Sequence, residues 1–95
     1  MEELPIPAAA TMDEKSVELV RVWAANGEQH VSIAHPMWDD PGAWGLILAD
    51  LARHVALAYQ QARGADPAAV RSRIKAAFEA EWAEPTNEHS GGLLS

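Results

Sequence analysis

The chain contains no cysteine. Without thiols it can form neither a disulfide framework nor a thiolate metal site, and it has no cysteine nucleophile. Basic residues are also few, because seven Lys and Arg stand against fourteen Asp and Glu, for a formal net charge of -7. Nucleic acids and anionic lipids are bound through cationic surfaces, so neither is expected as a partner. No apolar run approaches the ~18 residues of a membrane span, and no membrane partner is expected either.

The length of 95 residues predicts a single domain, which we place at residues 1–84. The remaining residues, 85–95, are polar and contain Gly and Ser, so a disordered tail is expected there. The chain begins with the acidic Met1-Glu2-Glu3, whereas a secretory signal begins with basic residues and continues through an apolar run. The absence of cysteine fits a reducing compartment, and a cytoplasmic location is therefore predicted.

The strongest local signal is Asn26-Gly27, which lies between two runs of β-forming residues. A two-residue type I′ turn needs positive φ at both central positions, and Asn and Gly adopt it most readily. This turn predicts a hairpin over residues 19–33 in which Trp23 lies opposite His30. Because side chains alternate along a strand, one face of the hairpin is predicted to be apolar and to meet the core. That face carries Val20, Val22, Ala24, Val31 and Ile33.

Two Asp-Pro pairs predict the starts of two helices, since Asp is a good N-cap and Pro is favoured at the first helical position. The first helix is predicted over residues 41–63, ending at Gly64, and the second over 67–83. Apolar residues recur at helical spacing in both. In the first helix they are Trp44, Ile47, Leu48, Leu51, Val55 and Ala58, and in the second Val70, Ile74, Ala77 and Phe78, with Trp82 at the edge.

The expected fold is therefore α+β with two layers, in which a small antiparallel sheet built on the hairpin at 19–33 packs against the two helices. Before the hairpin, Leu4 and Ile6 alternate with prolines. This pattern is compatible with an edge strand at residues 3–7 or with an extended arm that docks the two side chains. Thr11 and Glu14 have the spacing of a capping box, which predicts a short helical turn over 11–18.

Histidines are the first candidates for chemistry. His30, His35 and His54 could together form a metal- or pH-responsive site, but their spacing matches no known metal motif, and no metal or other cofactor is predicted. Asp50 and His54 can touch on one helix, as in the second half of a catalytic triad, yet no serine has the context of a nucleophile. An ordinary surface pair is the better interpretation, and no catalytic residue is predicted.

Two surfaces are candidates for binding. A pocket is predicted near His35, Trp38, Asp39 and Trp44, where glycines would let another backbone approach. An interaction surface is predicted at Trp23 and His30 on the second hairpin face, with Leu46 and Leu57 on the far side of the first helix. For Trp23, burial under another segment is the favoured alternative, because soluble monomers avoid exposed apolar patches.

Four stretches together resemble a family of small bacterial proteins classed only as a domain of unknown function. They are residues 4–7 (LPIP), 20–27 (VRVWAANG), 38–45 (WDDPGAWG) and 48–55 (LADLARHV), and the resemblance covers roughly residues 3–82. It implies a compact α+β domain in a bacterial cytoplasm. It implies no activity, cofactor or catalytic residue.

Three functions remain open on the sequence alone. The first is a non-catalytic protein-interaction domain that binds another protein or a second copy of itself. The second is a small ligand-binding or enzymatic domain that uses the predicted pocket, and the third is the metal- or pH-responsive domain. The first is favoured because no catalytic constellation is present, so the sequence favours a protein that is not an enzyme without deciding the question.

Overall fold

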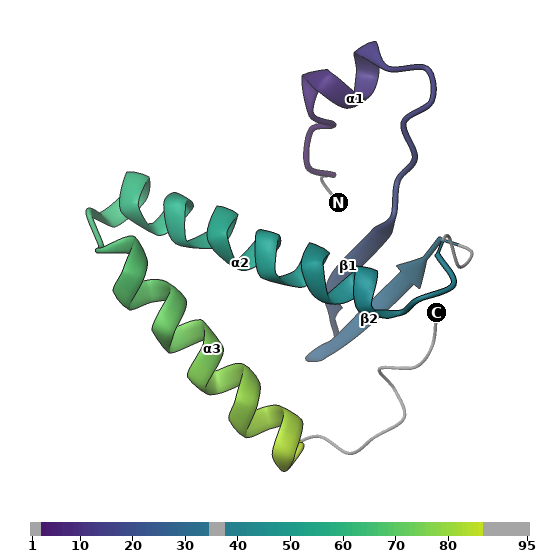
Figure 1. The fold of residues 1–95 in the computed structure, drawn as a ribbon. Helices are drawn as coiled ribbons and strands as arrows, with labels where there is room; N and C mark the ends of the chain where they lie inside the picture. The colour runs from purple at the N-terminus through teal and green to yellow at the C-terminus, as the bar shows by residue number, and fades with distance from the viewer. Residues whose placement is uncertain (1–2, 35–37, 87–95) are drawn as a thin grey trace. The chain divides into compact units, whose positions relative to one another are not determined.

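A computed structural model describes residues 3–34 and 38–86 (Figure 1). The elements follow in the order α1 (Ala8–Met12), β1 (Val20–Ala25), β2 (Glu28–Ile33), α2 (Gly42–Arg63) and α3 (Pro67–Ala83). The chain divides into two compact units. The hairpin unit is described over residues 3–34 and the helical unit over residues 38–86. A two-stranded sheet and helices confirm the predicted α+β class. Within the described residues, no helix has both the length and the apolar character needed to cross a membrane.

Strands β1 and β2 pair antiparallel in the predicted register, with Trp23 opposite His30 and Val22 opposite Val31. The turn has the expected backbone, since φ is 54° at Asn26 and 74° at Gly27. These left-handed conformations match the right-handed twist of the flanking strands, which is why a two-residue turn sets the register. The prediction of the hairpin is confirmed residue by residue.

Each face of the hairpin is largely exposed. Trp23 and His30 are half-buried on one face and Val31 on the other, the valine face, where Val22 and Ile33 are 58% and 54% exposed. That the valine face packs on the helices stays a prediction.

The N-terminal segment at residues 3–7 forms no strand, and the sheet of the described residues contains β1 and β2 alone. The edge-strand alternative is therefore wrong. Pro5 and Pro7 have no N–H to donate, which leaves this short segment few donors for a ladder. The arm does not dock its apolar side chains either, because Leu4 is 90% exposed and Ile6 is 69% exposed.

Helix α1 starts earlier than the predicted turn at residues 11–18 and spans Ala8–Met12. The three alanines after Pro7 are the best helix formers of the segment. Thr11 cannot act as the predicted cap, because it lies inside the helix and its Oγ1 donates to the carbonyl of Ala8 at 2.8 Å. The chain turns after α1 where Asp13 Oδ1 accepts the N–H of Lys15 at 2.9 Å.

The predicted limits of α2 and α3 are confirmed to within one residue. Asp40 Oδ1 accepts the N–H of Gly42 at 2.9 Å at the start of α2. At its end Gly64 is left-handed, with φ 67°, and donates its N–H to the carbonyl of Gln60. Asp66 caps α3 by accepting the N–H of Ala68 at 3.3 Å. Backbone groups at the helix ends are thus satisfied by the residues that the sequence pattern identified.

Helices α2 and α3 form a helical hairpin, and α3 runs along a side of α2 that carries small residues. Gly45, Ala49, Ala52 and Ala56 recur at helical spacing on this side. Ala56 is 1% exposed and is the only buried residue among those described. Two leucines of the predicted apolar stripe remain accessible, with Leu48 49% and Leu51 54% exposed. Close packing on this side is therefore found at Ala56, whereas a Cβ added at Gly45 would meet nothing within 4 Å.

Candidate interaction surface

An apolar groove of about 970 Å³ lies between α2 and α3. The two helices diverge from the turn that joins them (Figure 1). Residues of both helices line the groove. The side of α2 that lines it consists mainly of Gly45, Leu48, Ala49 and Ala52. Because three of these four side chains are small or absent, they cannot fill the space between the diverging helices.

The wall of the groove on α3 is formed by one helical face. Residues three and four apart share a face of a helix, and this spacing holds throughout the lining residues of α3. Phe78 and Trp82 stack on each other with ring centroids 5.5 Å apart and planes at 27°. Phe78 is nevertheless 49% exposed and Trp82 is 77% exposed. The face comprises Arg71, Ile74, Lys75, Phe78, Glu79 and Trp82.

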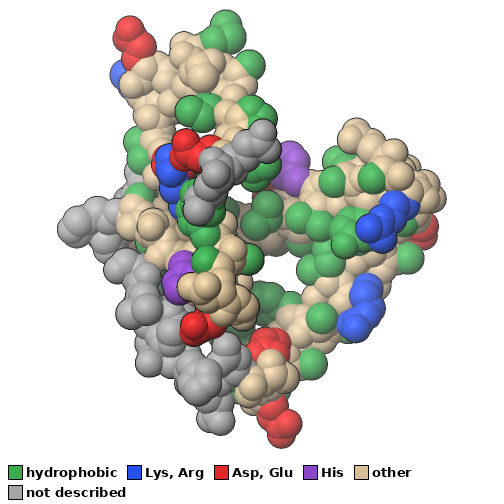
Figure 2. Space-filling view, turned by 180° about the vertical axis from the view of Figure 1, so that it is seen from behind, with side chains coloured by type: hydrophobic (Ala, Val, Ile, Leu, Met, Phe, Trp, Pro, Cys, Tyr) green, Lys and Arg blue, Asp and Glu red, His purple; other side chains and the backbone are tan. Residues whose placement is uncertain are grey.

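Charged side chains border this apolar surface. Arg53, Arg71 and Lys75 are three of the chain's seven Lys and Arg residues, and all three line the groove. Lys75 Nζ lies 3.5 Å from Glu79 Oε2 in a pair that is mostly exposed. Figure 2 shows hydrophobic side chains gathered over the helical unit, with Lys and Arg side chains beside them. An apolar floor with charged borders is the usual composition of a protein-binding surface.

The sequence reasoning did not identify this groove. It placed Phe78 in a core stripe and Trp82 at the edge of that stripe. The helix continues to Ala83, as predicted, and the Glu81 carboxylate accepts the N–H of Thr86 at 2.8 Å. The repeat of Ile74, Phe78 and Trp82 at every fourth position was the available signal. This repeat predicts a continuous apolar line along the helix, but it does not predict which segment covers that line.

The predicted contact residues Leu46 and Leu57 are exposed, at 75% and 49%. Leu46 follows Gly45 and Leu57 follows Ala56, which belong to the side of α2 that carries small residues. Both leucines therefore lie about 100° around the helix axis from that side. They line a separate surface and are not part of the groove. Their role in binding stays a prediction.

The other predicted contacts, Trp23 and His30, form a cross-strand pair on the hairpin. His30 Nε2 lies 3.3 Å from the carbonyl oxygen of Ala25, within the same unit. Both side chains are half-buried, so part of each remains accessible. The structure brings these two residues together as the register required.

Of the predicted pocket residues, His35 lies outside the described residues. Trp38 and Trp44 meet edge to face, with centroids 5.8 Å apart and planes at 78°. Trp38 is 40% exposed, and Asp39 is exposed beside it. The structure thus brings the two tryptophans together at the start of α2, and neither of them lines the α2–α3 groove.

His54 and Asp50 make the predicted contact, with Nε2 and Oδ2 3.1 Å apart. Both side chains are largely exposed, at 70% and 64%, as in an ordinary helix surface pair. In residues 3–34 and 38–86, no three His, Asp or Glu side chains come together as metal ligands would.

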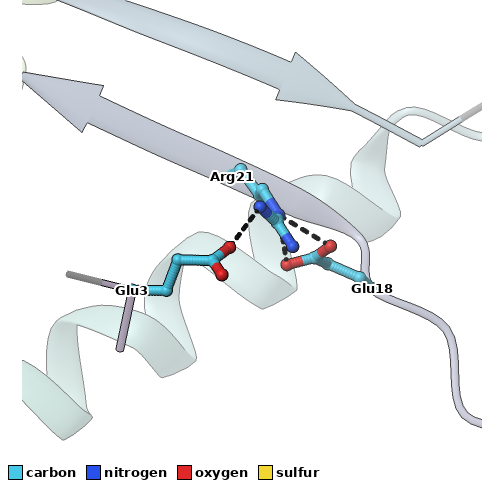
Figure 3. A network of polar contacts seen from close by, with 3 residues as sticks. All are labelled: Glu3, Glu18 and Arg21. Carbon is cyan, nitrogen blue, oxygen red and sulfur yellow. Dashed lines mark hydrogen bonds and ion pairs between the residues drawn. The ribbon is translucent and has the colours of Figure 1, made fainter. Parts of the chain in front are cut away.

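A charged network joins the N-terminal arm to the hairpin (Figure 3). Arg21 donates through Nε to both carboxylate oxygens of Glu18 at 2.9 Å and through Nη1 to Glu3 Oε2 at 2.7 Å. The hydrogen bond and charge of Glu18, followed by those of Glu3, raise the pKa of Arg21 above its ordinary value. The guanidinium is therefore a permanent positive charge that holds the arm near β1.

Comparison with solved structures gives a match over most of the chain. A protein from the photosynthetic bacterium Rhodopseudomonas palustrus CGA009, provisionally described as a pyruvate dehydrogenase, is 29% identical in sequence, with a TM-score of 0.73. The match covers 94% of this chain and 91% of that one. The description belongs to that protein, and the similarity supports the architecture described above. No curated protein matches.

The resemblance noted in the sequence is confirmed by comparison with protein families. The family described as Domain of unknown function (DUF5076) matches residues 3–86. That range includes the hairpin, both long helices and every residue of the α2–α3 groove. The chain belongs to this family, the Domain of unknown function (DUF5076).

Proposed function

We propose that this protein is a non-catalytic protein-interaction domain that functions as a homodimer. The observation that carries the proposal is the Phe78–Trp82 stack, which lines an apolar groove yet leaves Phe78 49% and Trp82 77% exposed. Large aromatic side chains contribute most to binding when a partner removes them from water. Contiguous apolar surface of this kind on one chain marks a site of association.

The distribution of apolar residues around α2 supports a second chain. The helix carries accessible apolar side chains in the groove, on the predicted stripe and at Leu46 and Leu57. Helix α3 contacts one side of α2. A helix that is apolar on most sides is stable in water only when most sides are covered. A partner surface would complete that cover.

The predicted contacts enter the proposal as secondary sites. Leu46 and Leu57 would extend the interface along α2, and Trp23 with His30 would offer a smaller half-exposed surface on the hairpin. We place the protein in the bacterial cytoplasm, without a nucleic-acid partner, in keeping with the net charge of -7. Fractionation of cells that express the protein would test the location.

Sedimentation equilibrium over a wide concentration range tests the proposal. We expect the mass of two chains, and dissociation of the dimer when Phe78→Asp introduces a charge into the groove. The matched control is Val17→Asp, which adds the same charge at an exposed apolar residue of the hairpin unit. A mass of one chain for the unsubstituted protein at every concentration would overturn the proposal.

A further inference from the structure

We propose that the partner in the groove is helix α3 of a second copy, paired antiparallel with its counterpart across a two-fold axis near Phe78. The inference rests on the proposed homodimer and names the surface that forms it. It follows from the order of charges along the face of α3 that lines the groove.

Charge changes sign along this face. Arg71 and Lys75 precede Phe78, and Glu79 follows it. An antiparallel copy reverses the order, so Lys75 of each chain comes near Glu79 of the other. A parallel copy would place Lys75 beside Lys75 and Glu79 beside Glu79, and like charges opposed across an interface are unfavourable. Charge complementarity therefore selects the antiparallel arrangement.

The apolar residues of the face agree with this arrangement. Ile74, Phe78 and Trp82 recur every four residues, and a two-fold axis near Phe78 places Ile74 of one copy beside Trp82 of the other. A small aliphatic side chain then meets the large exposed indole, while the two Phe78 rings meet at the axis. The small residues of α2, among them Gly45 and Ala49, leave room in the groove for the incoming helix.

The ion pair within one chain is compatible with a second partner. Lys75 and Glu79 lie 3.5 Å apart, with side chains 77% and 64% exposed. Each group therefore has free donors or acceptors toward solvent. In the dimer the two pairs become a network of four charges, and every substitution in this network acts twice because the interface is symmetric.

Charge reversal at these positions tests the pairing. Lys75→Glu gives a copy with two negative charges beside Arg71 on the face, and Glu79→Lys gives one with three positive charges. We expect each variant alone to self-associate about tenfold more weakly than the unsubstituted chain, since like charges then oppose each other at two symmetric positions. We expect an equimolar mixture of the two to form a heterodimer at least as tight as the original homodimer.

Two further variants keep the result interpretable. Arg73→Glu makes the same charge change on α3 outside the groove lining and should leave association unchanged. The double variant Lys75→Glu/Glu79→Lys restores complementarity with itself, so it should form homodimers but not mixed dimers with the unsubstituted chain. Circular dichroism of each variant checks that α3 still folds, and recovery of binding in the mixture shows the same independently.

The outcomes separate this inference from the proposed function. A dimer that neither reversal weakens would overturn the α3 pairing while leaving the homodimer intact. If Lys75→Glu weakens association but Glu79→Lys strengthens it, an acidic segment such as the N-terminal arm of the second copy occupies the groove, and the α3 pairing is wrong. An unsubstituted chain that remains monomeric would overturn the inference together with the proposed function.

Discussion

The hairpin unit and the helical unit reach their structures by different routes. In the hairpin, two residues with positive φ, Asn26 and Gly27, determine which residues of β1 and β2 are paired. In the helical unit the caps at Asp40, Gly64 and Asp66 determine where the helices begin and end, but they do not determine how α2 and α3 meet. That depends on how α3 packs against the small residues of α2, of which Ala56 is buried. A strand pairing can be encoded locally, whereas a helix packing requires surfaces distant in sequence to fit.

The largest expected effect is at the contact between the helices. Ala56→Leu adds bulk at the residue that is 1% exposed, and overpacking of this kind costs about 1–3 kcal/mol. We expect the free energy of unfolding to fall by that amount in a urea titration. Ala58→Leu, at an exposed position of the same helix, is the matched control. Equal stability of the two variants would contradict a packing role for the small side of α2.

The hairpin should become less stable when the glycine of its turn is replaced. Gly27→Ala places a Cβ at φ 74°, a left-handed conformation that costs an L-residue about 1–2 kcal/mol. Nothing lies within 4 Å of the added atom, so the cost arises from the backbone alone. Loss of cross-strand nuclear Overhauser effects between Trp23 and His30 would accompany the destabilisation. Gly45→Ala should instead raise the free energy of unfolding by up to about 1 kcal/mol, because Gly45 lies within α2 and the added Cβ would meet nothing within 4 Å.

Helix capping should have a smaller effect than the packing between the helices. Asp66→Ala removes the acceptor for the N–H of Ala68, and loss of an N-cap typically costs about 1 kcal/mol. Asp66→Asn retains an acceptor and should retain most of the stability. Amide hydrogen exchange at the first turn of α3 would report the change. Unaltered exchange in Asp66→Ala would show that the turn between the helices, and not the cap, stabilises the first turn of α3.

The smallest effect on stability is expected at Arg21, whose ion pairs are exposed. Arg21→Lys removes the two-oxygen contact with Glu18, and we expect the arm at residues 3–7 to become more mobile without a measurable change in unfolding. Because the pKa of Arg21 is raised in the folded chain, its contribution is complete below the ordinary arginine pKa and is lost only when pH rises beyond the raised value. Backbone relaxation of the arm should therefore show no titration of Arg21 between neutral and mildly alkaline pH.

Much of the fold could be predicted because its signals are local. The turn at Asn26-Gly27 and the two Asp-Pro pairs each act within a few residues, and the hairpin register and the limits of α2 and α3 followed from them. The N-terminal predictions failed where two local patterns compete. The alanines after Pro7 form α1, which places Thr11 inside a helix and removes it as a cap.

The candidate surface could be predicted only in part. Leu46 and Leu57 were predicted to lie on the far side of the first helix as contact residues, and they are exposed. Phe78 and Trp82 were assigned to or near a core stripe, because periodicity identifies an apolar face without identifying what covers it. Their exposure depends on the divergence of α2 and α3, which is not encoded within either helix.

The hairpin, its register, the ends of the two long helices and the family resemblance follow from the amino-acid sequence alone. Each depends on short-range backbone chemistry or on a contiguous string of residues. Only the tertiary structure showed that α3 runs along the small side of α2 and that Phe78 and Trp82 line an open groove bordered by Lys75 and Glu79. The physical reason is that a groove is a property of two surfaces and the angle between them. Side-chain volume on both helices sets that angle, and no single stretch of the chain contains it.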